Sequence, residues 1–437
     1  DELLQQAEEA AAEQSMDDDG HSNNRDSPPA TTHFQNKYKA YTNQVPDEFQ
    51  SFYDVATVED FMATDRSGCD DVMDDSNRDY DYSVLELQLL CEWKQFVKST
   101  DKRRQIPNVI PAEKDEKKDH DITLVTQGSV DRLDRLLTHT QIWRGPISVA
   151  IYIKGFWDIS HMCRFFFDNE KAVRKTTFHV FMEKVFVPEQ DEYYPHNYLR
   201  NTALNYTDTA YVVNIDMDFM LNENAYKNLR RLVLHNGIVQ NALQHKTLLV
   251  LPAFELSPEG DERPELSAKQ NWSPADKAEM LHHVEQLETV EPFHIRRFEG
   301  GHYATNFKKW VSNNTAEIYE TTYNVGFEPY VLAKREGLPW FYPGFRGYGF
   351  NKMAWFHEVD LMFFRFAVLR DFFVFHVGDK SDDHKFSKAY LLSQKKAFDS
   401  YLKSKVNMLE SRGEIEAPSK KLRERRQREH GFWIGEM

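Results

Sequence analysis

Short apolar runs alternate with helical patterns between residues 121 and 254, and this alternation limits the possible folds more than any other feature. Strands are predicted at Ile122–Val125, Ile147–Ile153, Phe178–Met182, Ala210–Ile215 and Leu248–Phe254. Helices are predicted between them, at Phe156–Phe167, Pro195–Leu204 and Glu223–Leu234. Strands that alternate with helices predict an α/β domain with a largely parallel sheet.

The segments on either side of residues 121–254 differ from them in composition and pattern. Val84–Val97 has the spacing of an amphipathic helix, and residues 99–120 are polar and predicted to be a connector. Residues 257–314 are mostly polar, with one predicted helix at Pro274–Leu287. Later strands are predicted at Tyr330–Leu332, Val359–Val368 and Phe372–Val377. The expected organisation is a disordered stem over 1–82, a helix and linker over 83–120, one large domain over 121–404 and a charged tail over 405–437.

The negative charge of the chain is confined to its first segment. Residues 1–82 contain 21 acidic and 5 basic residues, which accounts for the whole net charge of −16. This segment is also poor in apolar residues, as disordered chains are. The remaining chain is neutral, and its basic cluster Lys420–Arg426 is interrupted by Glu424, so a solvated terminal helix is expected there and no nucleic-acid partner.

The sequence contains no run of about 18 apolar residues, so no membrane span is predicted and any anchor is expected upstream of Asp1. The three cysteines form no zinc-binding pattern and allow at most one disulfide. Glycosylation sequons at Asn205, Asn271 and Asn313 slightly favour a secretory compartment.

The predicted strand Ala210–Ile215 runs directly into Asp216-Met217-Asp218. Ligands of open α/β sheets bind beyond the carboxyl ends of strands. Two carboxylates at such a place suit a hard divalent cation, which prefers oxygen ligands and neutralises a diphosphate. The alternative is a turn with solvated carboxylates, because Asp-x-Asp often arises by chance.

Eight separated segments, in order, resemble the LARGE-type family of glucuronyltransferases, namely the second domain of LARGE and its single-domain relatives. They are Asp121–Leu133 (DITLVTQGSVDRL), Trp143–Ile153 (WRGPISVAIYI), Tyr194–Ala203 (YPHNYLRNTA), Tyr211–Phe219 (YVVNIDMDF), Thr305–Trp310 (TNFKKW), Phe327–Val331 (FEPYV), Gly347–Lys352 (GYGFNK) and Phe372–His376 (FFVFH). The resemblance covers residues 121–390 and leaves both tails unmatched.

The resemblance implies a GT-A-type fold, a catalytic domain over 121–404, an inverting mechanism, a UDP-sugar donor and a glycan acceptor. It also implies a Mn²⁺ or Mg²⁺ ion held by Asp216, Asp218 and His376, and a place in the lumen of the Golgi or another secretory compartment. His376 ends an apolar run, so a core histidine bonded to backbone is the alternative. The family has Pro-His after this position and this chain has Gly378-Asp379, so no further ligand is assigned there.

Inversion requires a base for the acceptor hydroxyl, and Glu328 is the candidate. This acid lies in an aromatic segment, where burial would raise its pKa. Gly326 stands where the family usually has an aspartate, which leaves Glu328 as the remaining acid. Glu358 and Asp360 are alternative bases.

Donor contacts are expected from Arg200, Asn306, Asn351 and Lys352. Glucuronate carries a carboxylate and needs a basic partner, for which Arg200, Lys308 and Lys352 are available. LARGE has two arginines where this chain has Pro343-Gly344, with Arg346 nearby. The alternatives are therefore a neutral donor such as UDP-N-acetylglucosamine or UDP-xylose, and an inactive glycan-binding scaffold. Trp310, at the end of the segment Thr305–Trp310, is either a sugar contact or ordinary core.

Overall fold

The computed structural model describes residues 82–113, 121–184, 194–258, 272–312, 316–347, 349–377 and 388–411. The predicted stem lies outside the described residues except for Tyr82, as do Asn271, Asn313 and residues 412–437. The chain divides into two compact units, which we describe separately. The larger unit includes residues 102–154 and 165–411, and the smaller includes 82–101 and 155–164, in their described parts.

The smaller unit contains α6 (Tyr82–Lys98), which matches the helix predicted at Val84–Val97, and the start of α8 (Phe156–Val173). Cys91 is disulfide-bonded, and Cys163 is a buried free thiol. These states fit the expectation of at most one disulfide.

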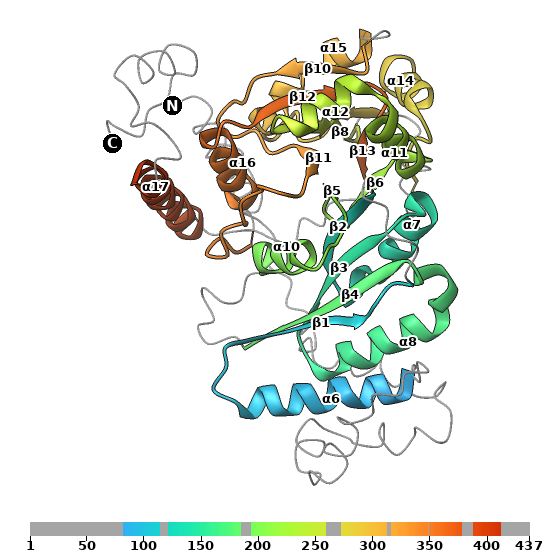
Figure 1. The fold of residues 1–437 in the computed structure, drawn as a ribbon, viewed down its shortest axis with the longest axis vertical. Helices are drawn as coiled ribbons and strands as arrows, with labels where there is room; N and C mark the ends of the chain where they lie inside the picture. The colour runs from blue at the N-terminus through green and yellow to red at the C-terminus, as the bar shows by residue number, and fades with distance from the viewer. Residues whose placement is uncertain are drawn as a thin grey trace, which may run out of the picture. The chain divides into compact units, whose positions relative to one another are not determined.

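The larger unit is built on a mixed sheet of nine strands in the described chain, in the order β1-β4-β3-β2-β5-β11-β7-β12-β10 (Figure 1). The strands are β1 (Arg103–Ile110), β2 (Ile122–Ser129), β3 (Ile147–Ile153), β4 (Thr176–Glu183), β5 (Tyr211–Asn214), β7 (Thr247–Leu251), β10 (Ile318–Thr321), β11 (Tyr330–Lys334) and β12 (Arg365–Leu369). Only β1, β10 and β11 run against the direction of the others. The sheet is therefore mostly parallel.

The helices of the larger unit are α7 (Leu133–Trp143), α10 (His196–Asn205), α11 (Ala225–His235), α12 (Gly237–Gln244), α14 (Lys277–Glu285), α15 (Phe307–Ser312), α16 (Asn351–Leu361) and α17 (Lys388–Ser411), together with the later part of α8. Helix α10 packs on β2, β3 and β4, α7 on β2, and α12 on β7 and β11. This architecture confirms the predicted α/β class, with a mostly parallel sheet and helices packed on it.

A second sheet joins β6 (Phe219–Leu221), β13 (Val374–His376), β8 (Ala253–Leu256) and β9 (Val290–Pro292). It shows that the predicted single strand Leu248–Phe254 is wrong. Pro252 separates β7 from β8, and the two strands belong to different sheets. Proline has no N–H to donate to a ladder, which explains the break at this residue.

Two further boundaries differ from the prediction. The supposed connector 99–120 contains β1, an edge strand antiparallel to β4. Its polar sequence misled the prediction because an edge strand is half exposed and tolerates Pro107, where the register shifts. The predicted strand Val359–Val368 begins too early, because α16 continues to Leu361 and β12 starts only at Arg365.

An aromatic-rich core lies around the strands of the second half of the chain. Trp310 is fully buried in it, packs against Phe254 and donates its indole N–H to the Leu369 carbonyl at 3.0 Å. Trp310 is therefore a core residue. Within the described residues, no helix has the length and apolar character needed to cross a membrane.

Candidate active site

Asp216 lies at an edge where strands of both directions meet. The Ile215 N–H donates to Val125 O at 3.1 Å, so Asp216 lies just beyond the paired part of β5. The antiparallel neighbour β11 begins at this same edge, with Val331 opposite Asn214. The hydroxyl of Tyr330 consequently reaches Asp216 and donates to Oδ2 at 2.9 Å.

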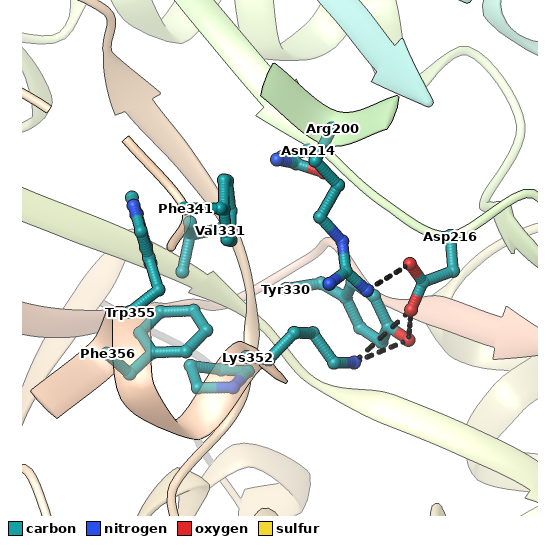
Figure 2. Close-up of a pocket in the computed structure, with 10 residues that line it drawn as sticks. Arg200, Asn214, Asp216, Tyr330, Val331, Phe341, Lys352, Trp355 and Phe356 are labelled. Carbon is teal, nitrogen blue, oxygen red and sulfur yellow. Dashed lines mark hydrogen bonds and ion pairs between the residues drawn. The ribbon is translucent and has the colours of Figure 1, made fainter. Parts of the chain in front are cut away.

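Basic side chains from two helices also converge on the Asp216 carboxylate (Figure 2). Arg200 of α10 donates to Oδ1 at 2.8 Å, and Lys352 of α16 donates to Oδ2 at 3.3 Å. Burial alone would raise the pKa of Asp216, but Arg200 and Lys352 outweigh it and hold the pKa well below its usual value. Asp216 is therefore ionised at neutral pH. The pocket around it also has an aromatic wall formed by Phe341, Trp355 and Phe356.

The Arg200 guanidinium is fixed by two asparagines. Its Nη1 donates to Asn197 Oδ1 at 2.9 Å and to Asn351 Oδ1 at 2.7 Å. The Arg200 side chain is only 3% exposed. Asn351 is also buried, and its side-chain oxygen is used by Arg200, so its predicted contact with the donor stays a prediction.

Lys352 lies in the first turn of α16, directly after a backbone with two left-handed residues. Gly349 has φ +84° and Phe350 has φ +55°. Glycine adopts such angles without strain, so Gly349 helps to set where α16 begins. The Lys352 amine also donates to Tyr330 OH at 3.0 Å, which places it between the tyrosine and Asp216.

Asp218 has a different set of basic partners, both next to or within α7. Arg132 Nη1 and Arg135 Nη1 donate to the same oxygen, Oδ1, at 2.9 and 2.7 Å. Among the described residues nothing donates to Oδ2 of Asp218. Burial raises the pKa of Asp218, and the two arginines oppose this effect without cancelling it. The two aspartates thus have unlike electrostatic environments.

The backbone between the aspartates is held by α7 and β2. His139 Nε2 lies 3.0 Å from the Met217 carbonyl. Burial, followed by nearby Arg135, lowers the pKa of His139 to about 4, so the ring is neutral and donates through Nε2. The Met217 thioether occupies the space beside Gly128, where an added Cβ would come within 2.7 Å of sulfur. These contacts fix the turn that presents both carboxylates.

His376 ends β13, opposite Phe219. Its ring is half-buried and packs near Phe219 and Phe293, with centroids 5.1 and 5.4 Å away. The next residue, Val377, donates its N–H to Asp218 O at 2.8 Å, so β13 brings His376 to the segment of the aspartates. Across the described residues, no three His, Cys, Asp or Glu side chains already form a cluster able to hold a metal.

Glu328 lies beside this network without joining it. Its N–H donates to Gly301 O at 2.9 Å, whereas its half-buried carboxylate forms no hydrogen bond or ion pair with the described residues. Burial raises its pKa, and nearby Lys352 opposes this. Gly326 has φ +95°, and an added Cβ would lie 3.0 Å from the Phe298 ring. An aspartate at 326 would therefore be strained in this backbone.

Comparison with known proteins agrees with this geometry. A family model described as "Glycosyl-transferase for dystroglycan" matches residues 121–193 and 188–409. The chain belongs to this family.

Curated relatives of the chain include human LARGE1, a xylosyl- and glucuronyltransferase, which is 31% identical over 259 residues, 59% of this chain and 31% of LARGE1. Chicken LARGE2s is 33% identical over 261 residues, 59% of this chain and 32% of that protein. The LARGE-like protein of Caenorhabditis elegans is 29% identical over 289 residues, 63% of this chain and 40% of that protein. This chain therefore spans between about a third and two fifths of the length of these relatives.

Two solved structures share a more distant likeness. Staphylococcus aureus TarS with UDP-GlcNAc is 10% identical, with 66% of each chain covered and a TM-score of 0.33. GalNAc-T7 with UDP, GalNAc and Mn²⁺ is 12% identical, with 72% of this chain and 55% of that chain covered and a TM-score of 0.36. At such TM-scores the likeness carries no inference about fold or function.

The remaining predicted site residues of this LARGE-type chain are placed elsewhere. Asn306 is exposed, and its Oδ1 accepts from Lys309 N, which caps α15. Arg346 forms a buried two-point ion pair with Glu183. Glu358 is buried and accepts from Tyr401 and Lys405 of α17, so it links two helices. Asn306, Arg346 and Glu358 thus have structural partners, and none of them lines the Asp216 pocket.

Several site residues were missed by sequence reasoning. Gln127, Tyr194 and Tyr330 lie within segments that carry the family resemblance, but they were not assigned roles. Tyr194 donates to Gln127 at 2.6 Å, and Gln127 in turn points its amide toward Asp216 at 3.5 Å. Arg135 and His139 follow Arg132 at helical spacing, which is the signal that would have placed them on one face of α7.

Replacement of Arg200 should destabilise the larger unit. Arg200→Met leaves the buried oxygens of Asn197 and Asn351 without their donor, at a cost of about 1–3 kcal/mol for each unpaired group. Urea denaturation should show this loss, whereas the exposed control Arg231→Met should not. Combining Arg200→Met with Asp216→Asn should cost less than the sum of the two changes. Additive losses would contradict the direct coupling.

Proposed function

We propose that the chain is an inverting, metal-dependent glycosyltransferase that moves a sugar, glucuronic acid in our assignment, from a UDP-sugar to a glycan acceptor. The observation that carries this proposal is the pair Asp216 and Asp218 at the carboxyl end of β5, in a member of a glycosyltransferase family. Four basic side chains surround the pair, which suits a donor with a negatively charged diphosphate.

Asp216, Asp218 and His376 carry side-chain groups that can bind a divalent cation. Carboxylate oxygens of Asp216 and Asp218 and the imidazole of His376 are ligands that Mn²⁺ accepts. Asp218 Oδ2 accepts from no described residue, which leaves one oxygen for a cation. The ion, when bound, would neutralise the charge that develops on the leaving diphosphate.

Glucuronate is the preferred donor sugar because of the basic groups in the pocket. Arg200 and Lys352 both line it, while Arg346 is committed to Glu183. A uronate carboxylate would therefore meet Arg200 or Lys352. The competing candidate is a neutral donor sugar. It is favoured by the ion pairs that Arg200 and Lys352 already form with Asp216, because these two side chains are then engaged before a uronate carboxylate binds.

Glu328 is the proposed base. The acceptor hydroxyl attacks the anomeric carbon in line, its C–O bond forms as the bond to UDP breaks, and the hydroxyl proton passes to the Glu328 carboxylate. A carboxylate with no protein partner in the described chain and a raised pKa suits this role. In this proposal the basic side chains of Arg200 and Lys352 lie beside the departing anion.

A secretory lumen, such as the Golgi, is the proposed location. The disulfide-bonded Cys91 fits an oxidising compartment. Asn205, a sequon asparagine, is exposed at the end of α10, where a glycan has room.

UDP release, measured with and without Mn²⁺ across a panel of UDP-sugars, tests the function. We expect UDP-glucuronate to be used best, excess chelator to stop the release, and Asp216→Asn with Asp218→Asn to abolish it in a folded protein. Asp134→Asn, an exposed aspartate of α7, is the matched control. Preference for UDP-N-acetylglucosamine or UDP-xylose would favour the neutral donor. Glycan binding without UDP release from any donor would instead indicate a scaffold.

The change Glu328→Gln keeps the side-chain shape and removes the basicity. It should lower kcat roughly a hundred- to ten-thousand-fold, with donor and metal affinity retained. Because the base acts when unprotonated, the wild-type rate should rise with pH through the pKa of Glu328, and the variant should lack this rise. The exposed Glu320→Gln is the control. An unchanged kcat would assign Glu328 a structural role.

A further inference from the structure

Two guanidinium groups converge on a single oxygen of the second aspartate. Arg132 and Arg135 both donate to Asp218 Oδ1, and both charges lie where a cation bound to Asp218 would be close. Like charges at such distances repel one another. A divalent ion and both arginines therefore compete for the same carboxylate.

The two arginines differ in how firmly they are held. Arg135 has a second, backbone anchor, because its Nη1 also donates to Val377 O at 2.9 Å, and its side chain is 21% exposed. Arg132 is 37% exposed, and its other partner is the exposed carboxylate of Asp131 at 3.3 Å. Exposed ion pairs contribute little to stability, so Arg132 can leave Asp218 at low cost.

We propose that Arg132 is an exchangeable latch: it holds Asp218 in the donor-free enzyme, yields it to the divalent cation, and then binds the diphosphate of the donor. This inference rests on the proposed function of the same site. A guanidinium released beside a metal-bound diphosphate finds phosphate oxygens that match its two-pronged geometry. Arg135 keeps its bond to Val377 O and maintains the link between α7 and the end of β13.

Removing Arg132 should change Mn²⁺ affinity and UDP affinity in opposite directions, and this distinguishes the proposed role from a structural one. Removing Arg132 should strengthen Mn²⁺ binding to the nucleotide-free protein, because a competitor for Asp218 is gone. The same change should weaken the binding of UDP in saturating Mn²⁺, because a diphosphate ligand is gone. A residue that only supports the fold would weaken both.

Isothermal titration of Arg132→Gln with MnCl₂, and then with UDP in saturating Mn²⁺, tests this. The Mn²⁺ dissociation constant should fall about two- to fivefold, the value of an exposed ion pair. The UDP dissociation constant should rise about tenfold or more. Arg231→Gln, an exposed arginine of α11, removes the same charge and should change neither constant. Arg132→Lys, which keeps the charge, should restore part of the UDP affinity.

Equal weakening of Mn²⁺ and UDP binding, or no change in either, would overturn the latch. The double change Asp216→Asn with Asp218→Asn separates this result from a failure of the proposed function. If the double variant loses Mn²⁺ binding, the metal site stands and only the role of Arg132 is wrong. If it keeps full Mn²⁺ affinity, the metal assignment itself fails.

Discussion

The ionised carboxylate of Asp216 is the centre on which the rest of the site depends. Its pKa stays low in a largely buried position because Arg200 and Lys352 offset the cost of burial. Each partner comes from a different element: Arg200 from α10, Lys352 from α16 and Tyr330 from β11. One charge thus ties together segments that lie far apart in the sequence. The loss of Arg200 or Lys352 would remove one of the two positive charges that hold the pKa of Asp216 low.

The two aspartates have different physical roles, although they are separated by one residue. Both oxygens of Asp216 accept from protein donors, so this carboxylate mainly organises the pocket. Asp218 has its protein donors on one oxygen, and its pKa is raised rather than lowered. In our account, Asp218 is the group that exchanges protein partners for a cation. We expect the turn at Met217, whose carbonyl accepts from His139, to keep the two carboxylates in place during this exchange.

The sequence predicted the strand that ends in Asp216 and most of the α/β alternation, because buried parallel strands are continuous apolar runs. It failed at β1, whose polar residues belong to an exposed edge, and at Pro252, where one apparent strand joins two sheets. Single residues were harder to place, because apolar patterns do not encode side-chain pairing. Arg135 and His139 contact the aspartate turn only because α7 packs beside it, and no local pattern encodes that contact.

Glu358 and Arg346 are a second case in which the sequence did not show how a charged side chain is paired. Both carry the right charge for a catalytic or donor-binding role, but each forms an ion pair, Glu358 with the half-buried Lys405 and Arg346 with the buried Glu183. Glu328 differs because its carboxylate has no such partner among the described residues. Charge and residue type therefore identified candidates, and burial together with pairing separated them.

A crystal of the protein grown with Mn²⁺ and UDP, measured at the manganese absorption edge, would test whether Asp218 exchanges Arg132 for a cation. We expect an anomalous peak at coordination distance from Asp218, with the Arg132 side chain turned from Asp218 to the diphosphate. An ordered UDP with no manganese peak at Asp218, or a peak away from the carboxyl end of β5, would contradict it.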